Sequence, residues 1–149
     1  MTVTQNPIVA TNCVIKLDDA SGTPVDISGS LNKVEIAYTA GVATYRPFGT
    51  QWPRRQVVGK DATISVTAVY SSPSDEAAPL IQAWALAGND AARTLDIYAP
   101  DSTAGSFRYI GEFVLASTNI PLDSEADDVV RVTFECQVHG EFVLATVAS

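Results

Sequence analysis

Hydrophobic and polar residues alternate along most of the chain, which is the pattern of β-strands with one buried face. The alternation is clearest in residues 130–139 and 60–70. Further strands are expected at residues 11–17, 25–27, 31–39, 94–99, 106–116 and 142–147. Seven or eight strands, many joined by short turns, predict a mainly β fold, either a β-sandwich or a partly closed barrel.

Apolar residues recur at every third or fourth position only between Ser74 and Gly88, so this segment is predicted to be the one α-helix, flanking the sheet. Asp75 and Glu76 place negative charge at its amino end, and Pro79 falls in its first turn. Gly88 supplies the carboxyl-terminal stop. Because the segment is apolar almost all round, we expect the helix to be covered on more than one side.

The length of 149 residues fits a single domain covering residues 1–149. No apolar run approaches the roughly 20 residues of a membrane-spanning helix, and the amino end has no basic cluster followed by an apolar run. We therefore expect a protein that acts without secretion and without a membrane. Cys13 and Cys136 fall on inward strand faces and are expected to be buried free thiols.

The net charge of −8 is unevenly distributed along the chain. Residues 1–35 carry a net charge of −2 and residues 61–149 a net charge of −10, whereas residues 36–60 carry four basic residues and no acidic one. The acidic excess argues against general adhesion to nucleic acid or to anionic membranes. One positive segment in a negative molecule indicates two complementary surfaces.

Residues 40–59 interrupt the strand pattern with two prolines, three glycines and no sustained period. A structureless loop of that length is uncommon in a compact domain and is usually functional. Its aromatic and arginine side chains, of types enriched at protein interfaces, are Tyr45, Arg46, Phe48, Trp52, Arg54 and Arg55. Three interpretations are open: an extended arm that contacts another subunit, a loop folded back onto its own acidic body, and a nucleic-acid contact by stacking and phosphate binding.

The residue types needed for catalysis or metal binding do not occur in suitable patterns. His139 is the single histidine, and neither cysteine has an evident activating base. Gly-rich phosphate loops and nucleophile elbows are absent from the sequence. We therefore expect a protein that is not an enzyme and needs no cofactor or metal. A binding module that holds carbohydrate or a small ligand near Trp52 and Trp84 is the alternative from a different class.

The order of these features resembles that of the major tail tube proteins of long, non-contractile-tailed bacteriophages, which are related to type VI secretion tube proteins. The similarity rests on the long arm, the strand from Gly59 to Tyr70, the lone helix, and the late segments 109–120 and 132–140. An acidic residue that follows the tyrosine in that pattern is replaced here by Ser71.

The resemblance implies subunits that form rings of about six, with strands of each closing a continuous inner barrel, and rings that stack into the tube through which the genome leaves. It implies further copies and other tail proteins (tape measure, terminator, distal tail) as partners, assembly in the host cytoplasm and a place in the virion tail. Glu35 and Glu135, outward on regular strands, are the candidate lumen-lining residues. An acidic lumen repels duplex phosphates, so DNA passes without specific binding. A tail terminator or another ring-forming relative would show the same pattern.

Overall fold

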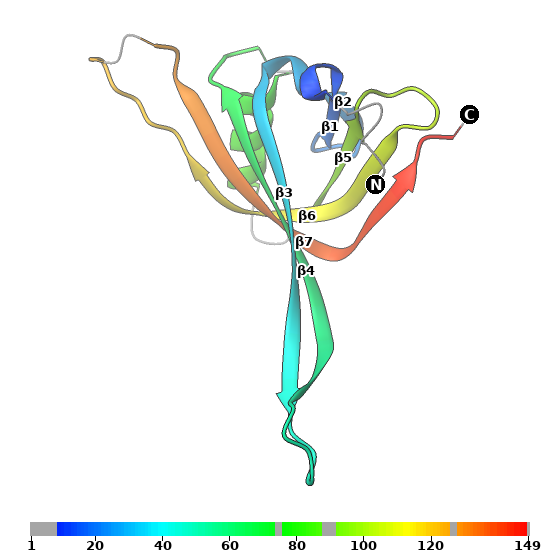
Figure 1. The fold of residues 1–149 in the computed structure, drawn as a ribbon. Coiled ribbons are helices and arrows are strands. Elements are labelled where there is room, and N and C mark those ends of the chain that lie inside the picture. Colours follow the sequence, from blue (N-terminus) through cyan, green and yellow to red (C-terminus); the bar gives the residue numbers. More distant parts are fainter. Residues whose placement is uncertain (1–8, 74–75, 88–91, 126–127, 149) are drawn as a thin grey trace.

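The protein, described by a computed structural model over residues 9–73, 76–87, 92–125 and 128–148, has one antiparallel sheet of seven strands (Figure 1). The spatial order of the strands is β2-β1-β5-β6-β7-β4-β3. The strands are β1 (Val14–Asp18), β2 (Pro24–Asp26), β3 (Leu31–Tyr45), β4 (Arg54–Val69), β5 (Arg93–Ala99), β6 (Phe107–Asn119) and β7 (Arg131–Thr146). One α-helix, α1 (Ala77–Leu86), lies between β4 and β5 in the chain, and two short 3-10 helices cover Ala10–Asn12 and Ser28–Ser30.

The sheet is curved and carries the hydrophobic core on one face (Figure 1). The core side chains come from the positions that the alternating pattern marks as inward: Ile15, Leu17, Ile64, Val66, Ala68, Leu95, Ile97, Val132, Phe134 and Cys136, with Phe113 of β6. Each of these side chains is at most 6% exposed. The prediction of a mainly β fold with one flanking helix is confirmed, and the sheet is open, with β2 and β3 at its two edges.

Helix α1 packs on the core face against β4 and β6. Ala77, Ala78, Leu80, Ile81 and Trp84 are its buried residues. The expectation of cover on more than one side was wrong for this chain, because Leu86 is 87% exposed and the neighbouring alanines are exposed too. Pro79 lies in the first turn as expected, whereas the Glu76 side chain makes no capping hydrogen bond. Asp75 and Gly88 lie outside the described residues.

Two expected strand boundaries were wrong at the carboxyl end of the chain. The predicted strands 130–139 and 142–147 are one continuous strand, β7. Gly140 has a φ of +102°, and around it the register shifts, because Phe113 pairs with Val138 whereas Gly111 pairs with Phe142. A glycine at positive φ inside a strand produces a bulge that bends the strand without ending it. Among the described residues, no helix is long and apolar enough to span a bilayer.

Candidate assembly surfaces

The arm, residues 40–59, is a two-stranded ribbon and not the structureless loop expected from its composition (Figure 1). β3 continues to Tyr45 and β4 begins at Arg54, and these two residues are paired with each other. β7 pairs with β4 only from Thr63 onward, so the arm strands pair only with one another within the described chain. The ribbon projects alone from the curved sheet.

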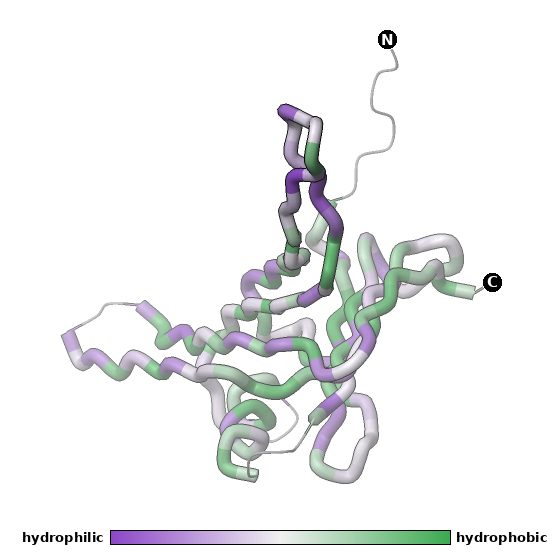
Figure 2. Tube along the Cα trace, turned by 90° about the horizontal axis from the view of Figure 1, so that it is seen from below, coloured by the Kyte–Doolittle hydropathy of each residue, from purple (hydrophilic) through white to green (hydrophobic). Residues whose placement is uncertain are grey.

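The strands of the arm escaped prediction because both of their faces are exposed. An alternating pattern arises only where one face is buried. A register shift between Gly41 and Val42, opposite Gly59 and Val57, also disturbs the alternation. Figure 2 shows hydrophilic and hydrophobic residues interspersed along this ribbon.

The arm tip, residues 47–53, is organised by a turn. The Thr50 amide donates a hydrogen bond to the Pro47 carbonyl at 3.3 Å, and the Thr50 hydroxyl donates to the same carbonyl at 2.9 Å. Gly49 has a φ of +83°, as the third residue of a type II turn requires. Phe48 and Gly49 are the two central residues of this turn.

The aromatic side chains of the arm are exposed to solvent. Tyr45 is 53% exposed, Phe48 108% and Trp52 80%, and the arginines Arg46, Arg54 and Arg55 are exposed as well. The ion pairs found among the described residues are Lys33–Glu35, Arg108–Asp96 and Arg131–Asp128. None of them involves the arm, so the interpretation of a loop folded back onto its own acidic body does not hold for this chain.

The face of the sheet opposite the core is polar over β3, β4, β7 and β6. Cross-strand partners point to the same face, so the register defines rows of side chains. The rows are Lys33, Thr67, Thr133 and Asn119; Glu35, Ser65, Glu135 and Ser117; and Ala37, Thr63, Gln137 and Val114. We call these twelve residues the polar face. The structure thus brings both candidate lumen residues onto one row.

The two glutamates of the polar face differ in their surroundings. A carboxylate oxygen of Glu35 lies 2.7 Å from the Lys33 ammonium, but both side chains are more than half exposed, so the pair contributes little to stability. Glu135 is half-buried beside the core residue Cys136. Burial, and secondarily the Glu135 carboxylate, raise the pKa of the Cys136 thiol to about 12. Cys136 is therefore a neutral, inert core group at physiological pH.

A charged cluster joins β5 and β6 at the other end of the sheet. The Arg108 guanidinium donates to both carboxylate oxygens of Asp96, at 3.0 Å from Nε and 2.7 Å from Nη2, and this pairing raises the pKa of Arg108. The Tyr98 hydroxyl donates to the same carboxylate at 3.0 Å, and burial followed by this hydrogen bond raises the pKa of Tyr98. These contacts stabilise the pairing of the two strands.

The two tryptophans do not share a cleft. Trp52 lies on the arm and is 80% exposed, whereas Trp84 is 2% exposed in the core, with the Arg93 guanidinium 5.6 Å from its ring centre. The alternative of a ligand cleft near both residues was therefore wrong. His139 is exposed, and the described residues contain no group of three or more His, Cys, Asp or Glu side chains placed to hold a metal ion.

Solved structures share this fold. A chain in the structure of the SPP1 tail tube aligns with a TM-score of 0.75 and 11% identity, over 96% of this chain and 81% of that one. A chain in the structure of the anti-feeding prophage (AFP) baseplate, 6-fold symmetrised, aligns with a TM-score of 0.74 and 12% identity, over 97% of this chain and 99% of that one.

A third chain, from the tail of an empty GTA particle with C6 symmetry, aligns with a TM-score of 0.67 and 18% identity, over 95% and 99% of the two chains. No family model and no curated protein sequence matches this chain. The fold is thus that of phage and injection-system tail proteins. It is found in a sheath-tube complex of a contractile injection system as well as in the SPP1 tail tube.

Two features that bear on assembly could not be found by sequence reasoning. Among the described residues, β3 has no strand partner along its outer edge, and β6 has none on the β5 side from Val114 to Asn119, because β5 pairs with β6 only up to Phe113. Both edges border the polar face. Only the register, which depends on contacts far apart in the sequence, reveals them.

Proposed function

We propose that the chain is a structural subunit of a phage-type tail tube, not an enzyme, and that it self-assembles into rings that stack head to tail. The fold shared with tail proteins of known structure supports this role. Rings of six are proposed because two of those assemblies have six-fold symmetry. The proposed location is the tail of a virion, reached by assembly in the host cytoplasm with other tail proteins.

The free strand edges support ring formation by a continuous sheet. Neighbouring strands from β6 through β7 and β4 to β3 are antiparallel, so β3 runs opposite to β6. The outer edge of β3 in one copy can therefore join the edge of β6 in the next copy as an antiparallel pair. Unpaired edges invite such pairing, and joining them around a ring leaves no free edge.

The polar face supports a water-filled lumen. A wall facing an aqueous channel is polar on one side and packed on the other, as these four strands are. Glu35 and Glu135 are the proposed lumen acids, and their negative charge repels duplex phosphates. DNA then passes through the channel without the counterion release that accompanies binding.

The observation that carries the proposal is the solitary arm. A two-stranded ribbon is marginally stable alone in water, and this one displays Tyr45, Phe48 and Trp52 beside Arg46, Arg54 and Arg55. Aromatic residues and arginine dominate interface energetics. A basic arm on an acidic body supplies two different, complementary surfaces, which is what a head-to-tail assembly needs.

The experiment replaces residues 42–58 with Asn-Gly, a two-residue turn that closes the hairpin at the Gly41–Gly59 pair. We expect a folded protein by circular dichroism that no longer self-associates in sedimentation analysis. The control is Gln51→Ala, which keeps the arm and should assemble as the unmodified protein does. Undiminished assembly without the arm, or loss of the folded state, overturns the role of the arm as an inter-subunit contact.

A tube terminator is the second candidate function. Chains from a sheath/tube terminator and from a tube-terminating cap align with this chain at TM-scores of 0.72 each. The two candidates differ in the product of self-assembly. A tube subunit forms tubes of variable length, whereas a terminator forms single rings.

A further inference from the structure

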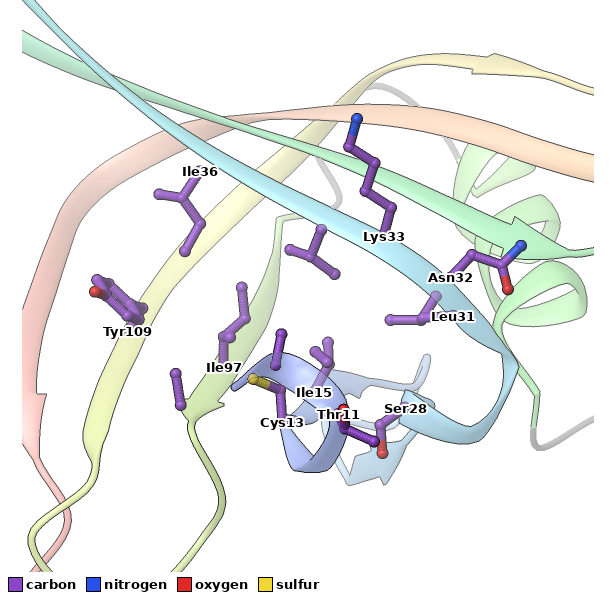
Figure 3. A pocket seen from close by; sticks show the side chains of 13 residues that line it. Thr11, Cys13, Ile15, Ser28, Leu31, Asn32, Lys33, Ile36, Ile97 and Tyr109 are labelled. Atoms are coloured by element: carbon purple, nitrogen blue, oxygen red, sulfur yellow. The ribbon is translucent and has the colours of Figure 1, made fainter. Parts of the chain in front are cut away.

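A cavity of about 360 Å³ lies between β3 on one side and β1 and β5 on the other (Figure 3). Its inner wall is apolar and includes Ile15, Leu31, Val34, Ile36, Ile97 and Tyr109. Its polar lining residues are Thr11, Ser28, Asn32 and Lys33, and the Lys33 ammonium is paired with the Glu35 carboxylate at 2.7 Å. Figure 3 shows the side chain of Cys13 among the lining groups. This volume is at the lower end of the range of ligand pockets, roughly 300–1,000 Å³.

The arm tip has the complementary composition. Residues 47–53 read Pro-Phe-Gly-Thr-Gln-Trp-Pro and carry no charge. Phe48 at the turn is fully exposed, and Arg46 and Arg54 follow immediately behind the uncharged tip. The tip therefore presents an aromatic group first and two cations behind it.

The tip cannot reach the cavity of its own chain. Ile36, the cavity residue of β3 nearest to the tip in sequence, precedes Arg46 by ten residues of extended strand and turn. At roughly 3.3 Å per strand residue, the tip lies on the order of 30 Å from the cavity. The ribbon also points away from β1 and β2 (Figure 1). A partner for the tip must therefore come from another molecule.

Acidic groups stand beside the rim of the cavity. The Asp26 carboxylate accepts a hydrogen bond from the amide of the rim residue Ser28 at 3.0 Å. Asp101 follows the lining residue Ala99 by two positions, and its carboxylate acts electrostatically on Cys13. An uncharged aromatic tip with arginines behind it thus matches an apolar cavity with carboxylates beside its mouth.

We propose that the arm tip of one copy inserts Phe48 into the cavity between β1 and β3 of a second copy, with Arg46 and Arg54 near Asp26 and Asp101. The inference rests on the proposed self-assembly and names the surface that receives the arm. The contact joins two different surfaces of one molecule, so it continues from copy to copy. Burial of an aromatic side chain in a preformed pocket is typical of an interface hot spot.

The chain itself supplies the probe for a test, because Cys13 lines the cavity and Cys136 is fully buried. Phe48→Cys places a thiol at the arm tip. A disulfide forms only when the two Cα atoms come within about 7 Å of each other. Mild oxidation of the assembled variant should therefore produce a ladder of covalent oligomers on a non-reducing gel. Thr50→Cys, which keeps Phe48, is the second variant should Phe48→Cys fail to assemble.

Two controls test whether the covalent oligomers arise from a disulfide between the arm-tip cysteine and Cys13. Adding Cys13→Ala to the Phe48→Cys variant should abolish the ladder. Ser124→Cys, an exposed thiol in the turn between β6 and β7, should give none with Cys13 intact. Tubes or rings that form while neither tip cysteine links to Cys13 overturn the cavity assignment and leave the proposed function standing. A protein that forms no assembly at all overturns both.

Discussion

Glu35 and Glu135 lie on the same transverse row of the sheet, with Ser65 between them and Ser117 beyond. One hundred residues of sequence separate the two carboxylates, and only the pairing of β3, β4 and β7 brings them together. Four neighbouring strands thereby present hydroxyl, amide and carboxylate groups on one face, while their other face contributes to the core or packs against it. The polar face is therefore the surface whose environment should change most on assembly.

A thiol on the polar face should become enclosed on assembly. Thr133→Cys should react with both a small and a large polymer-linked maleimide in the dissociated protein, but only with the small one in the tube. Ser124→Cys, outside the polar face, should react with both reagents in both states. Equal labelling of Thr133→Cys by the large reagent before and after assembly would place this face outside the lumen.

Charge reversal in the arm should weaken association without affecting the fold. Arg54 and Arg55 are exposed and form no ion pair among the described residues, so Arg54→Glu with Arg55→Glu should change the free energy of unfolding by no more than about 0.5 kcal/mol. Sedimentation should show assembly reduced at least about tenfold, since like charges meet across the contact. The control, Arg54→Lys with Arg55→Lys, keeps the positive charge and should assemble. Equal assembly of the glutamate and lysine variants would contradict an electrostatic role of these two residues.

Two phenylalanines should separate folding from assembly. Phe113 is fully buried and packs edge-on against Phe142 with ring centres 5.3 Å apart, so Phe113→Ala should lower the free energy of unfolding by about 3–5 kcal/mol. Phe48→Ala removes an exposed ring and should leave unfolding within about 0.5 kcal/mol while it weakens assembly. Chemical denaturation measures the first effect and sedimentation the second. Similar unfolding losses in both variants would show that Phe48 is a core residue.

Gly111 should be intolerant of a side chain. A Cβ at this position would lie 2.9 Å from Cδ2 of Phe142 and 3.0 Å from the Glu141 carbonyl oxygen, so Gly111→Ala must displace the β7 bulge. We expect a loss of about 1–3 kcal/mol in the free energy of unfolding, as for other overpacked sites. Gly59→Ala, where a Cβ meets nothing within 4 Å, is the matched control and should be close to neutral. The reverse order of the two losses would contradict the observed packing.

The Cys136 thiol should make stability fall in alkaline solution. Its pKa is about 12 in the folded state against 9.0 for an ordinary thiol. The folded state therefore holds this proton more tightly than the unfolded state does. The contribution of the protonated thiol to the free energy of unfolding is complete below about pH 9 and is lost as the pH rises towards 12. The loss approaches about 1.4 kcal/mol per pH unit in this window. Cys136→Ala lacks the group, so its stability deficit relative to the unmodified protein should shrink above pH 9; a constant deficit would refute the linkage.

The alternating sequence pattern predicted most of the sheet because inward positions such as Val132, Phe134 and Cys136 are apolar wherever a strand covers the core. The arm was wrongly predicted to be a structureless loop because both of its faces are exposed to solvent. Without a buried face, its strands show no alternation of apolar and polar residues in the sequence. Inward parity alone does not ensure burial: Tyr38 lies on the same face of β3 as Ile36, yet it is 58% exposed at the base of the arm.

The candidate site was predictable in composition but not in arrangement. The arm residues and the two glutamates were identified by type and parity, and their roles in assembly remain predictions. The common row of Glu35 and Glu135, the free edges of β3 and β6, and the cavity all depend on pairing between distant strands. Trp52 and Trp84 look alike in sequence, and only the tertiary structure separates an exposed ring from a core ring.

Electron microscopy of the concentrated, purified protein shows whether the chain forms a tail-tube-like assembly. We expect rings or tubes of uniform width, in which β3 of each subunit pairs with β6 of its neighbour and the polar face surrounds the channel. A protein that stays monomeric at every concentration and salt condition, with its arm in solvent, would contradict this expectation.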